Sequence, residues 1–295
     1  MKSPAKYGNH KLMVVACLAL SLVIASYAEG QRFGGQGYGG QGFGGSRRSD
    51  PTVFDRNEFP MWEIKKPYAK DVFTFVRIKT QPSWNRSSNR NWTADYPDAD
   101  FYFSWRLHQL TSLQVNPDPI TLELTDPQLN DFPFVFLAAP QSVDFSAAEV
   151  TALREYLLNG GFMMCDEFFG TIQWDLFHHQ LKRVFPEFEP VELNLSHEIF
   201  HMVYDLDFIP QVPAIHFWQR LGITYHPVAG TEVDNKPHFF GLHDAAGRMM
   251  VLICHNNDIQ DGWEREGEDK EFFTQFSVRQ SYPMGINIVT YALTH

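Results

Sequence analysis

The chain has 295 residues, with 24 basic and 35 acidic side chains and a formal net charge of −11. A surface this acidic repels phosphate groups, which argues against nucleic acid and anionic membranes as partners. Only three cysteines are present, too few for the disulfide framework of a small secreted domain.

The first 28 residues have the pattern of a signal peptide. Lysines precede an apolar run at 12–25, and Ser26 and Ala28 supply the small residues of a cleavage site. We expect cleavage after Ala28 rather than an uncleaved anchor, because the run is shorter than the ~20 residues of a membrane span. A lipoprotein signal at Cys17 is a weaker alternative, since Cys17 lies inside the run.

Cleavage makes the mature protein more acidic. It removes three of the 24 basic residues and none of the 35 acidic ones, which leaves a net charge of −14. The mature chain is then expected to be periplasmic or secreted, with no membrane attachment.

Residues 29–52 are predicted to form a Gly-rich disordered linker. An aromatic residue recurs every five positions from Phe33 to Phe43 in a Gly/Gln background. Such a composition buries too little apolar surface to offset the entropy of the chain. We interpret the segment as a flexible tether, with a self-associating or wall-contacting tail as the alternative.

Residues 53–295 are expected to form a single α/β domain. Short apolar runs bounded by turn residues predict buried strands. These strands are expected at 72–78, 120–124, 134–138, 162–165, 215–218, 238–242 and 249–254. Helices are expected from about residue 95, between Ser146 and Gly160, at 171–185 and at 284–293.

The stretch around residue 160 organises the predicted domain. Ser146 and Glu149 have the spacing of a capping box, and Gly160 supplies the left-handed residue that ends the helix. The apolar strand that follows leads to Asp166 and Glu167. Because ligands bind beyond the carboxyl ends of parallel strands, we expect the functional edge there.

Several of these runs together resemble the bacterial family called domain of unknown function 4159. The runs that carry the resemblance are 95–100, 104–107, 158–162, 166–170 and 284–294. The resemblance covers about 72–295. It implies a flavodoxin-like, mostly parallel sheet flanked by helices, related to the class I glutamine amidotransferase-like superfamily. It implies no activity.

The candidate ligand-binding residues are those expected at the carboxyl edge of the sheet. They are Asp166, Glu167, Arg77, Arg106, His255 and Asp258. We expect Asp166 to share a cleft with His255 or Asp258, and Arg77 or Arg106 to pair with it and keep it ionised. The alternative is an Arg–carboxylate network that only anchors loops. The acidic run from Asp258 to Glu271 is expected to be mostly solvated.

Cys165 lies near the place where class I amidotransferases carry their nucleophile. A nucleophile elbow needs small neighbours, whereas Met164, Asp166 and Glu167 flank this cysteine. Adjacent carboxylates would also raise the pKa of the thiol. We therefore expect no amidotransferase chemistry, and we expect Cys165 and Cys254 to be buried free thiols.

His197, Glu198 and His201 match the HExxH pattern of zinc proteases, in which two helical histidines hold the metal. Tyr204 and Asp207 stand where the extended motif needs glycine and a third histidine. We interpret the match as incidental and expect no cofactor, with a metal at His197 and His201 as the alternative.

Two functions remain open from the sequence. The first is an exported, non-catalytic module that binds a small molecule, a glycan or a protein partner at the carboxyl edge. The second is a hydrolase that uses Asp166 or Glu167 as acid or base, with or without a His-bound metal.

Overall fold

A central sheet of seven strands organises the domain. The computed structural model describes residues 54–65, 71–80, 92–227, 234–264 and 268–295. The strands are β1 (Val76–Ile78), β2 (Ile120–Leu122), β3 (Phe134–Ala138), β4 (Phe162–Phe168), β5 (Val191–Glu192), β6 (His238–His243) and β7 (Met249–His255). Their order is β2-β1-β3-β4-β7-β6-β5, so β4 lies at the centre.

The sheet is mixed but mostly parallel. Strands β2, β1, β3, β4 and β7 pair in parallel, whereas β6 pairs antiparallel with both β7 and β5. The α/β class predicted from the sequence is therefore confirmed.

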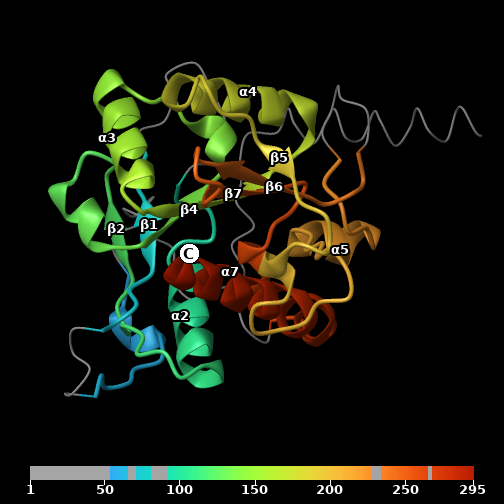
Figure 1. Ribbon diagram of the computed structural model, residues 1–295. Coiled ribbons are helices and arrows are strands. Elements are labelled where there is room, and N and C mark those ends of the chain that lie inside the picture. The colour runs from blue at the N-terminus through green and yellow to red at the C-terminus, as the bar shows by residue number, and fades with distance from the viewer. Residues whose placement is uncertain (1–53, 66–70, 81–91, 228–233, 265–267) are drawn as a thin grey trace, which may run out of the picture. The chain divides into compact units, whose positions relative to one another are not determined.

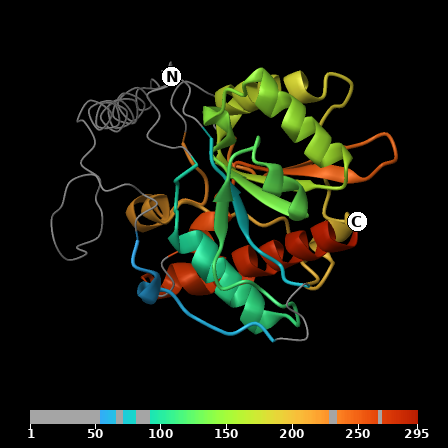
Figure 2. The same ribbon diagram turned by 90° about the vertical axis from the view of Figure 1, so that its left-hand side faces the viewer.

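Helices cover both faces of the sheet (Figure 1). Helices α3 (Ala147–Leu158) and α4 (Gly170–Val184) lie on one face, and α2 (Asp98–Leu110) and α7 (Tyr282–Thr294) lie on the other. The view turned by 90° shows the sheet between these two layers (Figure 2). The shorter α5 (Ile215–Leu221) and α6 (Lys270–Phe272) belong to the connections, and a π-helix, Phe273–Ser281, leads into α7.

Alternating side chains of the buried strands divide between two apolar cores. On β4, Met163 and Cys165 pack with α3 and α4, whereas Phe162 and Met164 pack with α2 and α7. All seven residues of β4 are buried. A strand covered on both faces has no polar alternation, which is why residues 162–165 form a continuous apolar run before Asp166 and Glu167 at the carboxyl end.

Most predicted elements are confirmed, including the capping box at the start of α3. The hydroxyl of Ser146 accepts from the backbone N–H of Glu149, whose carboxylate accepts from the N–H of Ser146. Gly160 has φ of 106° and ends the helix as expected.

The expected strand at 215–218 is wrong, because these residues begin helix α5. Gly222, with φ of 63°, ends that helix. The two-residue β5 was not foreseen. The expected signal peptide and Gly-rich linker lie outside the described residues. Within the described part of the chain no helix is long and apolar enough to span a membrane.

Gly285 allows α7 to pack closely on the aromatic core. A Cβ atom there would lie 2.6 Å from a ring carbon of Phe103 and 2.8 Å from one of Trp263. These two rings stack on each other with centroids 4.1 Å apart, so neither can move freely. We expect Gly285→Ala to lower the free energy of unfolding by about 1–2 kcal/mol in urea denaturation, although alanine is the better helix former.

The same substitution made together with Phe103→Leu should cost less than the sum of the two single changes, because the smaller side chain makes room for the methyl group. A Gly285→Ala variant as stable as the wild type would show that the contact is loose.

Candidate functional site

Asp166 and Glu167 lie at the carboxyl end of the central strand. The strand does not stop at Cys165 as expected but continues to Phe168, with a shift in its pairing to β7 between Cys165 and Phe168. Within the shift, Glu167 adopts φ of 67°, a left-handed conformation that costs energy for a side chain of this kind. Both side chains are buried, at 0% and 4% exposure.

The loop after β7 brings two further carboxylates to this edge. Asp258 is 2% exposed and Asp261 is 7% exposed. The Asp258 N–H donates to the carbonyl of Val212, and an Asp261 carboxylate oxygen accepts from the N–H of Ile215. The loop is thus fixed against the segment that precedes α5.

Burial of this loop corrects the expectation of a solvated acidic run at its start. Trp263 is fully buried, stacks on Phe103 and donates its indole N–H to the carbonyl of Ser281 at 3.1 Å. Because this large apolar side chain anchors the loop in the core, the neighbouring acidic residues of the loop are also buried.

Asp95 completes a group of three carboxylates. It lies in the connection between β1 and α2, and its carbonyl accepts from the N–H of Ala99 at 2.9 Å. Asp95, Asp258 and Asp261 each place one carboxylate oxygen within 4.8 Å of the others. We call these three residues, together with Asp166 and Glu167, the carboxylate cluster.

The electrostatics of the carboxylate cluster are those of buried like charges. Burial, with a contribution from the charge of Asp95, raises the pKa of Asp166 to about 7, although backbone hydrogen bonds oppose the change. Burial and the four neighbouring carboxylates hold the pKa of Asp258 well above its usual range. Among the described residues, neither Asp166 Oδ1 nor Asp258 Oδ1 has a hydrogen-bond partner.

Arg77 does not pair with Asp166 as predicted. Its guanidinium forms a fully buried ion pair with Asp100 at the start of α2. It reaches the cluster only through Gln260, whose side-chain oxygen accepts from Arg77 at 3.2 Å. The Gln260 side-chain nitrogen donates to Glu167 and its backbone N–H donates to Asp166, both at 2.9 Å.

Arg106 and His255, which were expected beside Asp166, make other contacts. Arg106 sits over the rings of Phe273 and Tyr282. His255 packs against Phe168 and Trp174, and its Nε2 hydrogen-bonds the carbonyl of Gly170 at 3.1 Å. Within the described residues Asp166 forms no ion pair, so the predicted arginine partner is wrong. Asp258 lies close enough to Asp166 to interact with its charge, and the shared cleft stays a prediction.

Cys165 and Cys254 are buried free thiols, each with 0% exposure. Burial, and then the charge of Asp166, raises the pKa of both thiols well above the usual value. A buried thiol with a raised pKa is a poor nucleophile.

The HExxH residues do not form a helix. Glu198–Phe200 is a single 3-10 turn, with His197 before it and His201 after it. His197 Nδ1 accepts from the N–H of Ile199, which puts the ring hydrogen on Nε2 and leaves no free lone pair for a metal. Both nitrogens of His201 are occupied, by Asp205 and by the carbonyl of Leu195.

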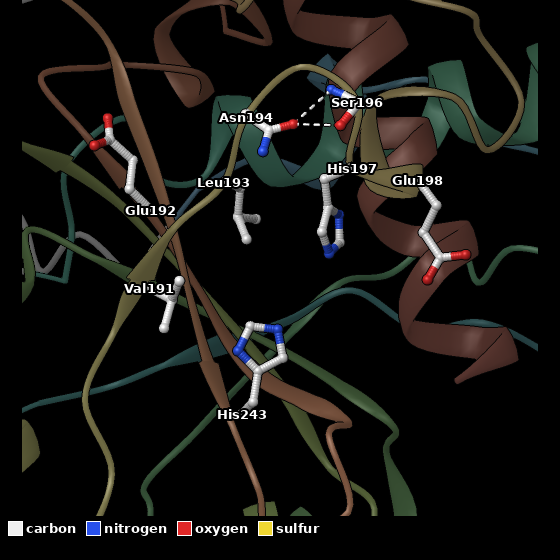
Figure 3. A pocket seen from close by; sticks show the side chains of 8 residues that line it. All are labelled: Val191, Glu192, Leu193, Asn194, Ser196, His197, Glu198 and His243. Atoms are coloured by element: carbon white, nitrogen blue, oxygen red, sulfur yellow. Dashed lines mark hydrogen bonds between the residues drawn. The ribbon is translucent and has the colours of Figure 1, made fainter.

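His197 instead lines a pocket of about 480 Å³. The pocket lies near the amino end of β7, at the edge of the sheet opposite the carboxylate cluster. The pocket lies beside β5 and at the end of β6, where His243 pairs with the first residue of β7. Figure 3 shows the rings of His197 and His243 turned toward each other, with Glu192 and Glu198 at the sides.

The sequence reading missed Asp95, Asp261 and Gln260 as parts of the site. In the sequence, Asp95 has the pattern of a helix start and Asp261 that of a solvated acidic run. A usable signal was present, because Ile259 and Trp263 place large apolar residues inside the acidic stretch and so indicate a buried turn.

Comparison with known families shows to which family the chain belongs. The model of a domain of unknown function, DUF4159, matches residues 74–293. The match covers most of the chain, which therefore belongs to this family. A search of curated proteins gave no match.

Breaking the Arg77–Asp100 pair should be costly. Arg77→Met leaves the Asp100 carboxylate buried with no counter-charge, and we expect a loss of about 3–5 kcal/mol in unfolding free energy. The double variant Arg77→Met with Asp100→Leu should recover a large part of the loss, because no unpaired charge remains buried. Equal losses in the single and double variants would contradict this account.

His255 should make the fold sensitive to acid. Burial lowers its pKa to about 4, against 6.5 for the free side chain. Below pH 6.5 the unfolded chain therefore binds a proton that the folded chain does not, and stability falls as the pH drops from 6.5 to 4, by up to about 3 kcal/mol. His255→Gln should reduce this loss, measured by denaturation at a series of pH values.

The neighbouring His238 must be considered in that comparison. Burial lowers its pKa, but hydrogen bonds to Glu192 and Asp234 outweigh burial and raise it, so its contribution is lost as the pH rises. The wild-type curve minus the His255→Gln curve cancels this effect. A flat difference between pH 6.5 and 4 would refute the assignment to His255.

Proposed function

We propose that the chain is an exported, non-catalytic binding module whose ligand site is the carboxylate cluster. The ligand carries positive charge, and it is a small molecule, a glycan or a segment of a protein partner. One observation carries the proposal: buried carboxylates converge on one point, and two of their oxygens have no hydrogen-bond donor among the described residues.

The order of the strands supports a flavodoxin-like fold. The parallel strands β2-β1-β3-β4-β7 follow the order 2-1-3-4-5 of that class. In such sheets ligands bind beyond the carboxyl ends of the strands. The cluster draws Asp95 from the connection after β1, Asp166 and Glu167 from the end of β4, and Asp258 and Asp261 from the loop after β7.

We further propose a relationship to the class I glutamine amidotransferase-like proteins without their chemistry. The thiol of Cys165 is fully buried and its pKa is raised, so it is unsuited to attack a substrate. The strained left-handed residue at the end of the strand is Glu167 rather than a cysteine. A glutamate in the place of the nucleophilic cysteine fits a site that binds a ligand without reacting with it.

Export to the periplasm or beyond remains part of the proposal, supported by the sequence of residues 1–28. The net charge of −14 after cleavage opposes binding to nucleic acid or to anionic membranes. The Gly-rich stretch would tether the module at a distance.

A hydrolase that uses Asp166 or Glu167 as acid or base is the second candidate. It is favoured by the pKa of Asp166, which at about 7 suits proton transfer at neutral pH. Against it, the side chain of Asp166 is 0% exposed, so a scissile bond would have to enter the interior. A binding site needs only one charged group of the ligand to reach the carboxylate oxygens that have no hydrogen-bond donor.

The proposal predicts opposite effects of one substitution on stability and on binding. Asp166→Asn keeps an oxygen to accept from the Gln260 N–H but removes one buried charge. In metal-free buffer we expect it to raise the free energy of unfolding by about 1–3 kcal/mol, because it relieves like-charge repulsion. In a thermal-shift screen of cationic compounds it should abolish the stabilisation that the wild type gains.

Asp126→Asn is the matched control. Asp126 is a helix-capping aspartate on the surface, where it accepts from the N–H of Gln128. This variant should respond to ligands as the wild type does. If Asp166→Asn lowers stability and leaves every ligand response unchanged, the carboxylate has a structural role and the proposed site is wrong.

A further inference from the structure

We infer that the carboxylate cluster binds one hard divalent cation of the calcium type, held by Asp95, Asp258 and Asp261. The inference rests on the proposed function, because it names the chemistry of the ligand at the same site.

The spacing of the three carboxylates suits a single ion. Their oxygens lie within 4.8 Å of one another. A Ca²⁺ ion contacts its oxygen ligands at about 2.3–2.6 Å, so two ligands on opposite sides of the ion are about 4.6–5.2 Å apart. All three carboxylates can therefore touch one ion without a change of the backbone.

Unbonded oxygens supply an independent indication. Asp258 Oδ1 is buried, with no donor among the described residues, on a side chain that is 2% exposed. Asp166 Oδ1 is in the same condition on a side chain that is fully buried. Buried polar atoms without a partner are rare in folded proteins, and an ion is one of the partners that satisfies them.

The donor set selects the type of metal. All five side chains of the cluster offer oxygen, and neither imidazole nor thiolate is among them. Hard cations such as Ca²⁺ and Mg²⁺ prefer oxygen ligands, whereas Zn²⁺ and Cu²⁺ favour nitrogen and sulfur. Ca²⁺ also tolerates irregular geometry, which suits ligands that come from two different loops.

Charge points in the same direction. Asp258 has four carboxylates as neighbours, those of Asp95, Asp166, Glu167 and Asp261. The charge of Arg77 is paired with Asp100, and this guanidinium reaches the cluster through the neutral Gln260. A divalent ion would offset the mutual repulsion of these neighbouring carboxylates.

Hydrogen bonds fix the loop that carries Asp258, and Asp95 is the most exposed of the three ligands. Asn257 accepts from the N–H of Val212 and donates to the carbonyl of Pro210, both at 2.9 Å, which holds the residue before Asp258. Asp95 is half-buried, whereas Asp258 and Asp261 are buried. An ion would enter past Asp95 and meet ligands that are already in place.

The test is metal binding by the purified full chain after treatment with EDTA and dialysis. Isothermal titration with Ca²⁺, Mg²⁺ and Mn²⁺ should show one ion per chain, with Ca²⁺ bound most tightly. Ca²⁺ at about a hundredfold above its dissociation constant should raise the unfolding midpoint by about 5–10 °C. Asp258→Asn and Asp95→Asn should each weaken Ca²⁺ binding at least tenfold, and Asp126→Asn should not.

Two variants are used so that a folding defect in one does not decide the result, since Asp95 is at the rim and Asp258 is inside. Metal binding that survives both substitutions lies elsewhere and overturns the inference. If no metal binds but 1,4-diaminobutane stabilises the chain through Asp258, the metal assignment falls and the proposed cationic ligand stands. If neither metal nor diamine has any effect, both proposals fail.

Discussion

Gln260 joins two parts of the carboxyl edge that differ in charge. Its side-chain oxygen accepts from Arg77, and its side-chain nitrogen donates to Glu167. A reversed amide would set donor against donor and acceptor against acceptor, so its orientation is fixed by its neighbours. Because Gln260 is fully buried, water cannot replace these bonds. The positions of Asp166 and Glu167 therefore depend on the loop after β7.

The buried ion pair positions the cluster without neutralising it. The guanidinium of Arg77 donates to Asp100, to the carbonyls of Trp92 and Ala94, and to Gln260. These bonds use all five N–H groups of the guanidinium. The contacts with Trp92 and Ala94 hold the segment that leads to Asp95. One arginine thus supports ligands from two loops, while its charge is satisfied by Asp100.

Much of the fold follows from local sequence patterns. β3 and the greater part of β4 and β7 are the apolar runs that a parallel strand buried on both faces requires, and the capping box of α3 is complete in the sequence. The error at 215–218 has a physical reason, because a short apolar run fits either a strand or a buried helix face. Gly222, in the left-handed conformation that ends α5, was the local signal for the helix.

The site was harder to foresee than the fold. Topology alone brings Asp166, Glu167 and Asp258 to one edge, since they follow neighbouring parallel strands. The partner of Arg77 depends on side-chain reach, and Asp100 in the next helix competes successfully with Asp166. Asp95 and Asp261 join the cluster through loop conformations that no periodic pattern encodes.

The loop after β7 uses two kinds of polar side chain for two purposes. Asn256 accepts from the N–H of Gly170. Asn257 accepts from the N–H of Val212 and donates to a neighbouring carbonyl, so these two amides hold the loop through hydrogen bonds. Asp258 follows directly, with one carboxylate oxygen that has no donor among the described residues. If hydrogen bonding alone were needed there, an amide would serve without the cost of burying a charge. The proposed cation site gives this contrast a reason, because a carboxylate offers the ion a negative charge that an amide lacks.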